Sequence, residues 1–334
     1  MSRSRLPFVA LAAALLSLTA LPAYASQDAH FGEQWSLQRI GAPAAWASTT
    51  GAGVRIGIVD TGIDLTHEDL AGKVVAHTSC LGSNGDPARC AGSAQDEQGH
   101  GTHVAGVAAA VRNNGVGIAG VAPDAELVVA KVLSGAGTGS IEDINAGIRW
   151  VVDNGAKVVN LSLGDPNFLL TSLQGTKLSE GIEYAWSHGA IPVVASGNTN
   201  PLGLGVLGSS DYGSMNALVV GATGPSDDVA AYSSPLGNAK WALMAPGGAG
   251  GGTPDRDVLS TFWKPGLANQ YAALAGTSMA APHVTGAVAL LLAQGHGQQA
   301  VVDRLLGSAD QNVSCGFNSP TCAGRLDVAR ATAR

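Results

Sequence analysis

The sequence is poor in charged and aromatic residues, which make up 13% and 5% of its 334 residues. Hydrophobic residues make up 46%, so the chain can bury a sizeable core and a disordered chain is excluded. Basic residues are outnumbered by acidic ones, 18 to 25, which gives a formal net charge of −7. An acidic protein is a poor partner for nucleic acid or for an anionic membrane, and we expect it to bind neither.

Cysteine is scarce as well, and no two cysteines have the C-x2-C spacing of many zinc sites, which disfavours such a site. Four cysteines allow three disulfide pairings, and sequence alone does not choose among them. We favour the two local pairs, because they close short loops: Cys80 with Cys90, and Cys315 with Cys322.

The N-terminus carries a targeting signal. Arg3 and Arg5 precede an apolar run that ends in Ala-Tyr-Ala, which is the pattern of a secretory signal peptide. We expect cleavage after Ala25, leaving one domain over residues 26–334 in an extracellular or periplasmic protein; an uncleaved membrane anchor is the alternative. Because residues 1–25 contain these two arginines and no acid, cleavage changes the formal net charge from −7 to −9. Export also permits disulfides.

Short runs rich in Val and Ile alternate with longer segments of helical character. The short runs are bounded by Gly, Asp or Asn and are typical of buried parallel strands; they cover residues 54–60, 125–133, 156–163, 190–196 and 217–223. The helix-like segments cover 101–111, 140–155 and 178–189, and Ser140 is an expected helix cap. This alternation predicts an α/β fold in a single domain, with a mostly parallel central sheet and helices on both faces. In such sheets, functional sites gather at the carboxyl ends of the strands.

Three motifs carry chemistry, although each is ambiguous alone. Asp60 in "IVDTGID" resembles an aspartic protease motif, but those enzymes need a second such carboxylate, and the chain has no other D-T-G or D-S-G. His100 and His103 in "HGTHVAG" lack the Glu that zinc proteases place beside the first His. Ser278 in "GTSMAAPH" lies at an expected helix N-terminus, where free N–H groups stabilise developing negative charge. The order Asp, His, Ser differs from the order Ser, acid, His of α/β-hydrolases.

Together, over about residues 35–293, the three motifs resemble those of the subtilisin-like serine proteases, the subtilases (peptidase family S8). The resemblance implies a subtilisin-like fold and a secreted serine endopeptidase that works through an acyl-enzyme. It implies that Ser278 is the nucleophile, His100 its general base and Asp60 the carboxylate that orients the imidazole. Asn198 in "VVASGN" matches the oxyanion-hole asparagine of the family. A non-catalytic binding module on the same fold is the alternative, and the presence of all four residues disfavours it.

The resemblance also implies an extended substrate that adds as a strand between two segments of the protease. The residues expected to line it are Gly137, Thr138, Gly139, Ser162, Leu163 and Gly164, with Ser196 and Gly197 before the asparagine. The apolar, glycine-rich loop 199–210 predicts a P1 pocket that accepts apolar side chains, with broad specificity elsewhere. We expect a monomer that acts on protein or peptide substrates and has no membrane contact after signal cleavage.

Calcium is the cofactor that the resemblance implies. Asp28, Asp69 and Asn114 match family calcium ligands, and oxygen ligands from three separate segments suit Ca²⁺. Ordinary surface acids and turns are the alternative. Secreted subtilases usually carry a propeptide that assists folding, whereas here a segment like a mature N-terminus follows the signal directly. We therefore expect folding without a propeptide, helped by calcium and disulfides; slow folding, or folding that needs another factor, is the alternative.

One apolar stretch, residues 272–293, has no charged residue and is long enough to suggest a membrane span. Pro282 and His283 would both be unfavourable in a bilayer helix. We therefore expect a turn over residues 274–280 and then a buried helix from about Ala280. Pro282 would lie near its start, where a missing N–H costs little, and His283 would pack in the core.

Overall fold

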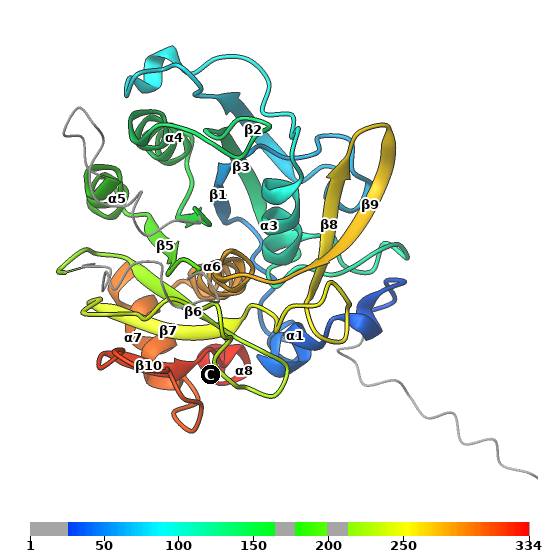
Figure 1. The fold of residues 1–334 in the computed structure, drawn as a ribbon, viewed down its shortest axis with the longest axis vertical. Coiled ribbons are helices and arrows are strands. Elements are labelled where there is room, and N and C mark those ends of the chain that lie inside the picture. The colour runs from blue at the N-terminus through cyan, green and yellow to red at the C-terminus, as the bar shows by residue number, and fades with distance from the viewer. Residues whose placement is uncertain (1–25, 164–177, 199–212, 334) are drawn as a thin grey trace, which may run out of the picture.

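The computed structural model describes residues 26–163, 178–198 and 213–333. Within them, eight strands form one parallel sheet: β1 (Arg55–Asp60), β2 (Val74–Ser79), β3 (Glu126–Lys131), β4 (Val158–Leu161), β5 (Ile191–Ala195), β6 (Leu218–Thr223), β7 (Trp241–Pro246) and β10 (Cys322–Arg325). Their order across the sheet is β10-β7-β6-β5-β4-β1-β3-β2 (Figure 1). Two further strands, β8 (Val258–Lys264) and β9 (Leu267–Leu274), form a separate antiparallel ribbon.

Helices cover both faces of the sheet (Figure 1). The helices are α1 (Trp35–Arg39), α2 (Ala42–Ala45), α3 (His100–Ala109), α4 (Ile141–Asp153), α5 (Leu178–Ser187), α6 (Thr277–Ala293), α7 (Gln298–Ser308) and α8 (Val328–Thr332). Short 3-10 turns lie at Phe31–Glu33, Glu68–Leu70 and Pro87–Arg89.

Alternate residues of each strand face opposite helix layers. In β1, Ile56 and Ile58 join the core cluster that contains α3 and α6. Val59 joins the other cluster, which contains α4 and α5. Because both faces are buried, the strands read as continuous apolar runs, and this confirms the predicted α/β fold with a mostly parallel sheet.

The five predicted strands and three predicted helices are all present, with ends within two residues of those expected. The Ser140 hydroxyl accepts a hydrogen bond from Asp143 N and caps α4 as predicted. The sequence analysis missed β2, β7, β10 and the ribbon. Strands β2 and β9 gave no signal because they are half exposed and lack a continuous apolar run.

Both local disulfides are formed, Cys80–Cys90 and Cys315–Cys322. All four cysteines are therefore paired, and none is left to bind zinc. The loop closed by the first disulfide is also held by the Asp143 carboxylate, which accepts hydrogen bonds from Gly82 N and Asn84 N.

The apolar stretch differs from the prediction in one respect. The expected turn over 274–280 is wrong: β9 continues to Leu274 and α6 already begins at Thr277. Pro282 is therefore the sixth residue of the helix rather than near its start. His283 does pack in the core, with Nδ1 2.8 Å from Met279 O. Burial lowers the pKa of its imidazole to about 4, so His283 is neutral there.

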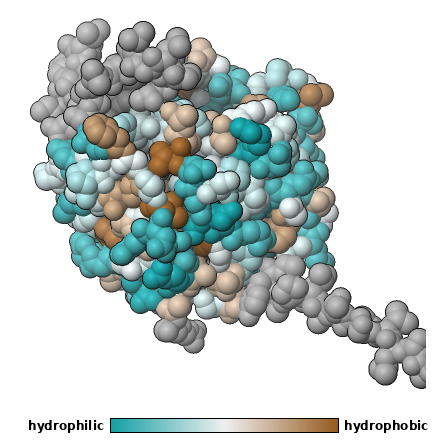
Figure 2. Space-filling view, turned by 60° about the horizontal axis from the view of Figure 1, so that its bottom comes forward, coloured by the Kyte–Doolittle hydropathy of each residue, from teal (hydrophilic) through white to brown (hydrophobic). Residues whose placement is uncertain are grey.

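In Figure 2, hydrophobic residues lie in small groups among hydrophilic ones. The large hydrophobic residues that the described part of the chain exposes are Val75, Leu81, Leu267 and Phe317. In the same part, none of the helices combines the length and apolar character that a membrane crossing requires.

Candidate active site

The motif residues meet at the carboxyl-terminal edge of the sheet. Asp60 is the last residue of β1, and Asn198 lies three residues beyond the end of β5. His100 is the first residue of α3 and Ser278 the second residue of α6. The two helices pack against each other and on the sheet, which brings their N-termini to this edge.

Asp60 and His100 are directly hydrogen-bonded. His100 Nδ1 lies 2.7 Å from Asp60 Oδ1, and Asp60 is fully buried while the His100 side chain is a quarter exposed. Burial disfavours the charged imidazolium, but the charge and hydrogen bond of Asp60, together with the charge of Asp96, outweigh it and raise the pKa of His100. A carboxylate on Nδ1 leaves Nε2 as the proton acceptor of the neutral ring.

The close approach of these two residues depends on glycine at position 101. A Cβ at Gly101 would lie 2.1 Å from Gly62 O and 3.1 Å from Asp60 Cβ. Any larger side chain would therefore push the start of α3 away from the end of β1, and His100 with it.

Ser278 is almost fully buried at the N-terminus of α6. Its hydroxyl donates to Ser162 O over 3.3 Å and makes no hydrogen bond to His100 in this structure. The backbone oxygen of Ser278 would normally accept from the N–H four residues later, but that residue is Pro282. Ser162 Oγ donates to this oxygen instead, over 2.8 Å.

The amide of Asn198 has a defined orientation. Its Oδ1 accepts from Thr277 N over 3.0 Å, and a backbone N–H can only donate, so Nδ2 is the opposite atom of the amide. A Cβ built on Gly276 would lie 3.6 Å from Asn198 Nδ2 and 3.7 Å from Ser278 N. Two N–H donors therefore border the same small space beside the Ser278 backbone.

The predicted substrate-lining residues divide between two segments and the asparagine loop. Gly137 and Thr138 lie in an exposed turn closed by a hydrogen bond from Ser134 N to Thr138 O, and Gly139 follows them. Ser162 and Leu163 lie buried just after β4. Ser196 and Gly197 follow β5, where Gly197 N donates to Thr277 Oγ1. Gly164 and the loop 199–210, with its predicted P1 pocket, lie outside the described residues.

The three predicted calcium ligands also come together, around the loop after α3. Asp69 is fully buried and accepts from Asn114 Nδ2 over 2.7 Å and from Ile118 N over 2.7 Å. Asp28 is 5% exposed and accepts from Asn113 N over 3.0 Å. Burial raises the pKa of Asp69, hydrogen bonds oppose this shift, and the charge of Asp28 adds to it. Two buried like charges this close fit a site for a divalent cation that prefers oxygen ligands.

No group of three or more acidic, His or Cys side chains that could hold a metal ion exists in the described ranges. An ion at this loop would therefore need the Asn114 amide and backbone carbonyls besides the two carboxylates. His103, the second histidine of its motif, is buried with Nε2 between Val258 O and Ala272 O. Burial lowers its pKa to about 3.

Sequence reasoning missed one buried charge beside the site. Asp96 is 0% exposed, and its carboxylate contacts both the segment after Asp60 and the start of α3. The available signal was its position four residues before His100 at the predicted helix start, because acidic residues cap helix N-termini.

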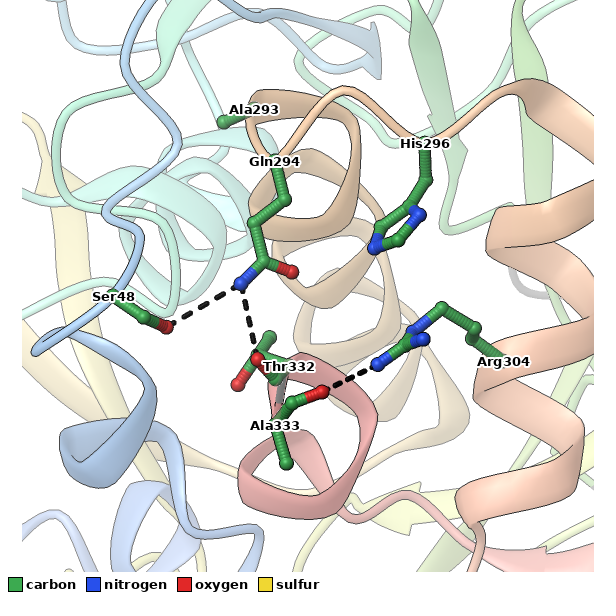
Figure 3. A pocket seen from close by; sticks show the side chains of 7 residues that line it. All are labelled: Ser48, Ala293, Gln294, His296, Arg304, Thr332 and Ala333. Atoms are coloured by element: carbon green, nitrogen blue, oxygen red, sulfur yellow. Dashed lines mark hydrogen bonds between the residues drawn. The ribbon is translucent and has the colours of Figure 1, made fainter.

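A separate cavity of about 590 Å³ lies at the other end of α6. In Figure 3, Gln294 and Arg304 reach across it to the backbone oxygens of Thr332 and Ala333. Seventeen helical residues, about 25 Å at 1.5 Å per residue, separate it from the N-terminus of α6. This cavity is therefore no part of the candidate active site. Its lining residues are Ser48, Ala293, Gln294, His296, Arg304, Thr332 and Ala333.

Fold and site together are those of a hydrolase with a hydroxyl nucleophile. The sequence profile of the Subtilase family (Peptidase_S8) matches residues 51–312, and the chain belongs to this family of serine endopeptidases. It is 36% identical over 311 residues to thermitase of Thermoactinomyces vulgaris, covering 92% of this chain and 99% of thermitase. It is 41% identical over 260 residues to Subtilisin Savinase of Lederbergia lenta, covering 77% of this chain and 83% of that protein.

Among solved structures, the chain is similar to a protease from Pseudoalteromonas arctica. The TM-score is 0.75 at 29% sequence identity, and the match covers 92% of this chain and 98% of that one. This similarity confirms the subtilisin-like fold that the sequence analysis predicted.

Proposed function

We propose that this serine endopeptidase cuts peptide bonds with Asp60, His100 and Ser278 as its catalytic triad. The observation that carries the assignment is the 2.7 Å hydrogen bond between a fully buried Asp60 and His100, in a family of serine endopeptidases. His100 Nε2 takes the hydroxyl proton of Ser278 as its oxygen attacks the scissile carbonyl carbon. The imidazolium then gives this proton to the leaving amine, and an acyl-enzyme remains. Water, activated by His100, releases the acyl group and restores Ser278.

Asn198 is proposed to stabilise the tetrahedral intermediate, together with the backbone N–H of Ser278. Both donors border the space beside Gly276, and Thr277 fixes the amide of Asn198 before substrate arrives. Donors that are oriented in advance stabilise charge in the transition state without reorganisation. The resting hydrogen bond from Ser278 to Ser162 O must break before attack, since the single hydroxyl proton cannot be donated to Ser162 O and to His100 at once.

Substrate is proposed to bind as an extended strand between residues 137–139 and the segment that begins at Ser162. Gly137 and Thr138 are exposed and Gly139 is half-buried, so a substrate strand can reach this turn and form main-chain hydrogen bonds with it. Such bonds ignore side-chain identity, so specificity should be broad and be decided mainly at P1. The apolar composition of loop 199–210 supports a preference for apolar P1 residues.

Calcium is proposed to bind at Asp28, Asp69 and Asn114. When bound there, it would offset the mutual repulsion of the two buried carboxylates. Asp28 belongs to the N-terminal segment, and Asp69 and Asn114 belong to the body of the fold. A calcium ion bound by all three would therefore hold the N-terminal segment against the rest of the domain. We also infer from the signal-like residues 1–25 that the protein is secreted and cleaved after Ala25. That it acts as a monomer is a separate proposal.

The triad is tested with a fluorophosphonate probe and with casein as substrate. The wild type should be labelled once, at Ser278, and should hydrolyse casein. Ser278→Ala should lose the label and nearly all hydrolysis. Ser48→Ala is the matched control. Ser48 lines the cavity beside the far end of α6, so this variant should behave as the wild type. Equal labelling of the wild type and Ser278→Ala would show that the nucleophile is another residue.

A further inference from the structure

The carboxylate of Asp96 joins the two chain segments that carry Asp60 and His100. It is 0% exposed and accepts five hydrogen bonds, which makes it one of the best satisfied buried charges of the described residues. Asp96 lies in the loop that leads into α3, four residues before His100.

The Oδ1 atom faces the Asp60 segment and the turn before the helix. It accepts from Thr61 Oγ1 over 2.9 Å, from Gln98 N over 2.9 Å and from Gly99 N over 3.0 Å. Thr61 Oγ1 in turn accepts from Gly101 N over 2.9 Å. The chain Asp96–Thr61–Gly101 therefore connects the residue after Asp60 with the residue after His100.

The Oδ2 atom faces the first turn of α3. It accepts from Thr102 N over 3.0 Å and from Thr102 Oγ1 over 2.5 Å. The same Thr102 Oγ1 accepts from Asp64 N over 2.9 Å, which adds a second connection back to the Asp60 segment. The N-cap residue, Gly99, has no side chain to cap the helix, and Asp96 accepts from Gly99 N and Thr102 N instead.

We propose that Asp96 is a positioning residue for the reaction: it clamps the start of α3 to the end of β1 and so holds His100 against Asp60. The proposal rests on the proposed triad. Asp96 does not touch substrate or any reacting atom, and it acts through Thr61, Thr102 and the backbone around His100.

This position also has an electrostatic consequence. Burial lowers the pKa of His100. The carboxylate of Asp60 and, to a smaller extent, that of Asp96 raise it. A further titratable group near His100 is His103, on the next turn of α3, which is neutral because burial lowers its pKa to about 3. Hydrogen bonds from Gly99, Thr102 and Gln98 outweigh the burial of Asp96 and lower its own pKa, so Asp96 is charged at neutral pH.

The test is Asp96→Asn, compared with the wild type in the pH dependence of kcat and kcat/KM on a peptide substrate. Asn keeps an oxygen for Thr61 but turns an NH₂ group toward Thr102 N, so α3 should shift relative to β1. We expect kcat to fall roughly ten- to hundredfold with KM little changed, since small misplacements of catalytic groups have effects of this size. The acid limb of kcat/KM should move to lower pH, because one negative charge near His100 is lost.

Asp64→Asn is the matched control. Asp64 is also buried, in the same segment as Asp60, but among the described residues its carboxylate accepts only from Thr66, through N and Oγ1. This variant should keep the wild-type kcat and acid limb. The His100 titration, followed by NMR of its imidazole protons in the Ser278→Ala background, gives a readout that does not need activity, and it should move to lower pH only in Asp96→Asn.

Thr61→Val is a second variant, for the case that Asp96→Asn does not fold. It removes the hydroxyl between Asp96 and Gly101 without changing any charge. We expect a lower kcat with an unchanged acid limb. Wild-type kcat in Thr61→Val, or an unshifted His100 titration in a folded Asp96→Asn, would overturn the proposal. Failure of the proposed triad would appear differently, as an unchanged wild-type activity in Ser278→Ala.

Discussion

Ser162 and Ser278 are joined by two reciprocal hydrogen bonds. Ser162 Oγ donates to Ser278 O over 2.8 Å, and Ser278 Oγ donates to Ser162 O over 3.3 Å. The first bond exists because Pro282 has no N–H for the Ser278 oxygen. The second holds the candidate nucleophile in a resting position beside the segment that we propose lines the substrate. A single serine after β4 thus both completes the helix that carries Ser278 and restrains its hydroxyl.

Removing the Ser162 hydroxyl should destabilise the protein, because it leaves the buried Ser278 oxygen without a donor. We expect Ser162→Ala to lower the free energy of unfolding by about 1–3 kcal/mol, measured by urea unfolding in the Ser278→Ala background to prevent self-cleavage. In this background Pro282→Ala should restore part of the loss, because residue 282 then has an N–H for the same oxygen. The recovery should be partial, since Asn160 Nδ2 also loses its Ser162 partner. Additive effects of the two substitutions would contradict this account.

Asn198→Ala should slow acyl transfer without weakening substrate binding. We expect kcat to fall about 10²- to 10³-fold with KM nearly unchanged, the range known for loss of one oxyanion-hole donor in a subtilisin. Thr277→Val is the control: it removes the Oγ1 contacts to Asn198 and to Gly197 N but keeps the backbone donor that orients the amide. Its kcat should fall much less. If KM rose and kcat stayed constant in Asn198→Ala, the amide would be a substrate-binding group instead.

Two core histidines should make the fold acid-sensitive. Burial lowers the pKa of His283 to about 4 and that of His103 to about 3, from an ordinary value of 6.5. Below about pH 6.5 these two histidines bind protons in the unfolded chain but stay neutral in the folded protein. The free energy of unfolding should therefore fall as pH falls. The slope is about 1.4 kcal/mol per pH unit for each histidine. The raised pKa of His100 adds stability below 6.5 that is lost only at higher pH, so it does not contribute to this slope.

Urea unfolding of Ser278→Ala between pH 7 and 4.5 measures the effect. His283→Gln removes one of the two groups and should make the slope about half as steep. A free energy of unfolding that stays level between pH 6.5 and 4.5 would refute the assignment of these histidines as neutral core groups.

The sequence was most informative where burial is complete. Runs such as residues 54–60 have one interpretation because both of their faces are apolar, and the order of Asp60, His100 and Ser278 separated one class of hydrolase from others. Strand β9 was missed because it is half exposed. For this reason the predicted start of α6, at about Ala280, came later in the sequence than its actual start at Thr277. Asp96 was missed because its partners are mostly backbone N–H groups and threonine hydroxyls, whose meeting depends on the tertiary fold. For the same reason, the carbonyls of a calcium site are not visible in a sequence.

Calcium should stabilise the protein through Asp69. With the Ser278→Ala variant, we expect the thermal midpoint to be higher in calcium than in a chelator, by about 2.7 kcal/mol of linked free energy when calcium is at 100 times its Kd. Asp69→Asn should abolish this difference. The calcium ion would lose one of the two buried carboxylates that attract it, and the remaining carboxylate of Asp28 would no longer be repelled by a second charge.

Asp257→Asn is the matched control for this prediction. Asp257 is 1% exposed, but its oxygens accept from Gly250 N and Gly252 N, and so organise the glycine-rich loop instead. This variant should lower both midpoints and preserve the difference between calcium and chelator. Calorimetric titration should show calcium binding in Asp257→Asn and not in Asp69→Asn. An equal calcium effect in both variants would assign the ion to another part of the chain, since only one of the two substitutions alters the loop where Asp28, Asp69 and Asn114 meet.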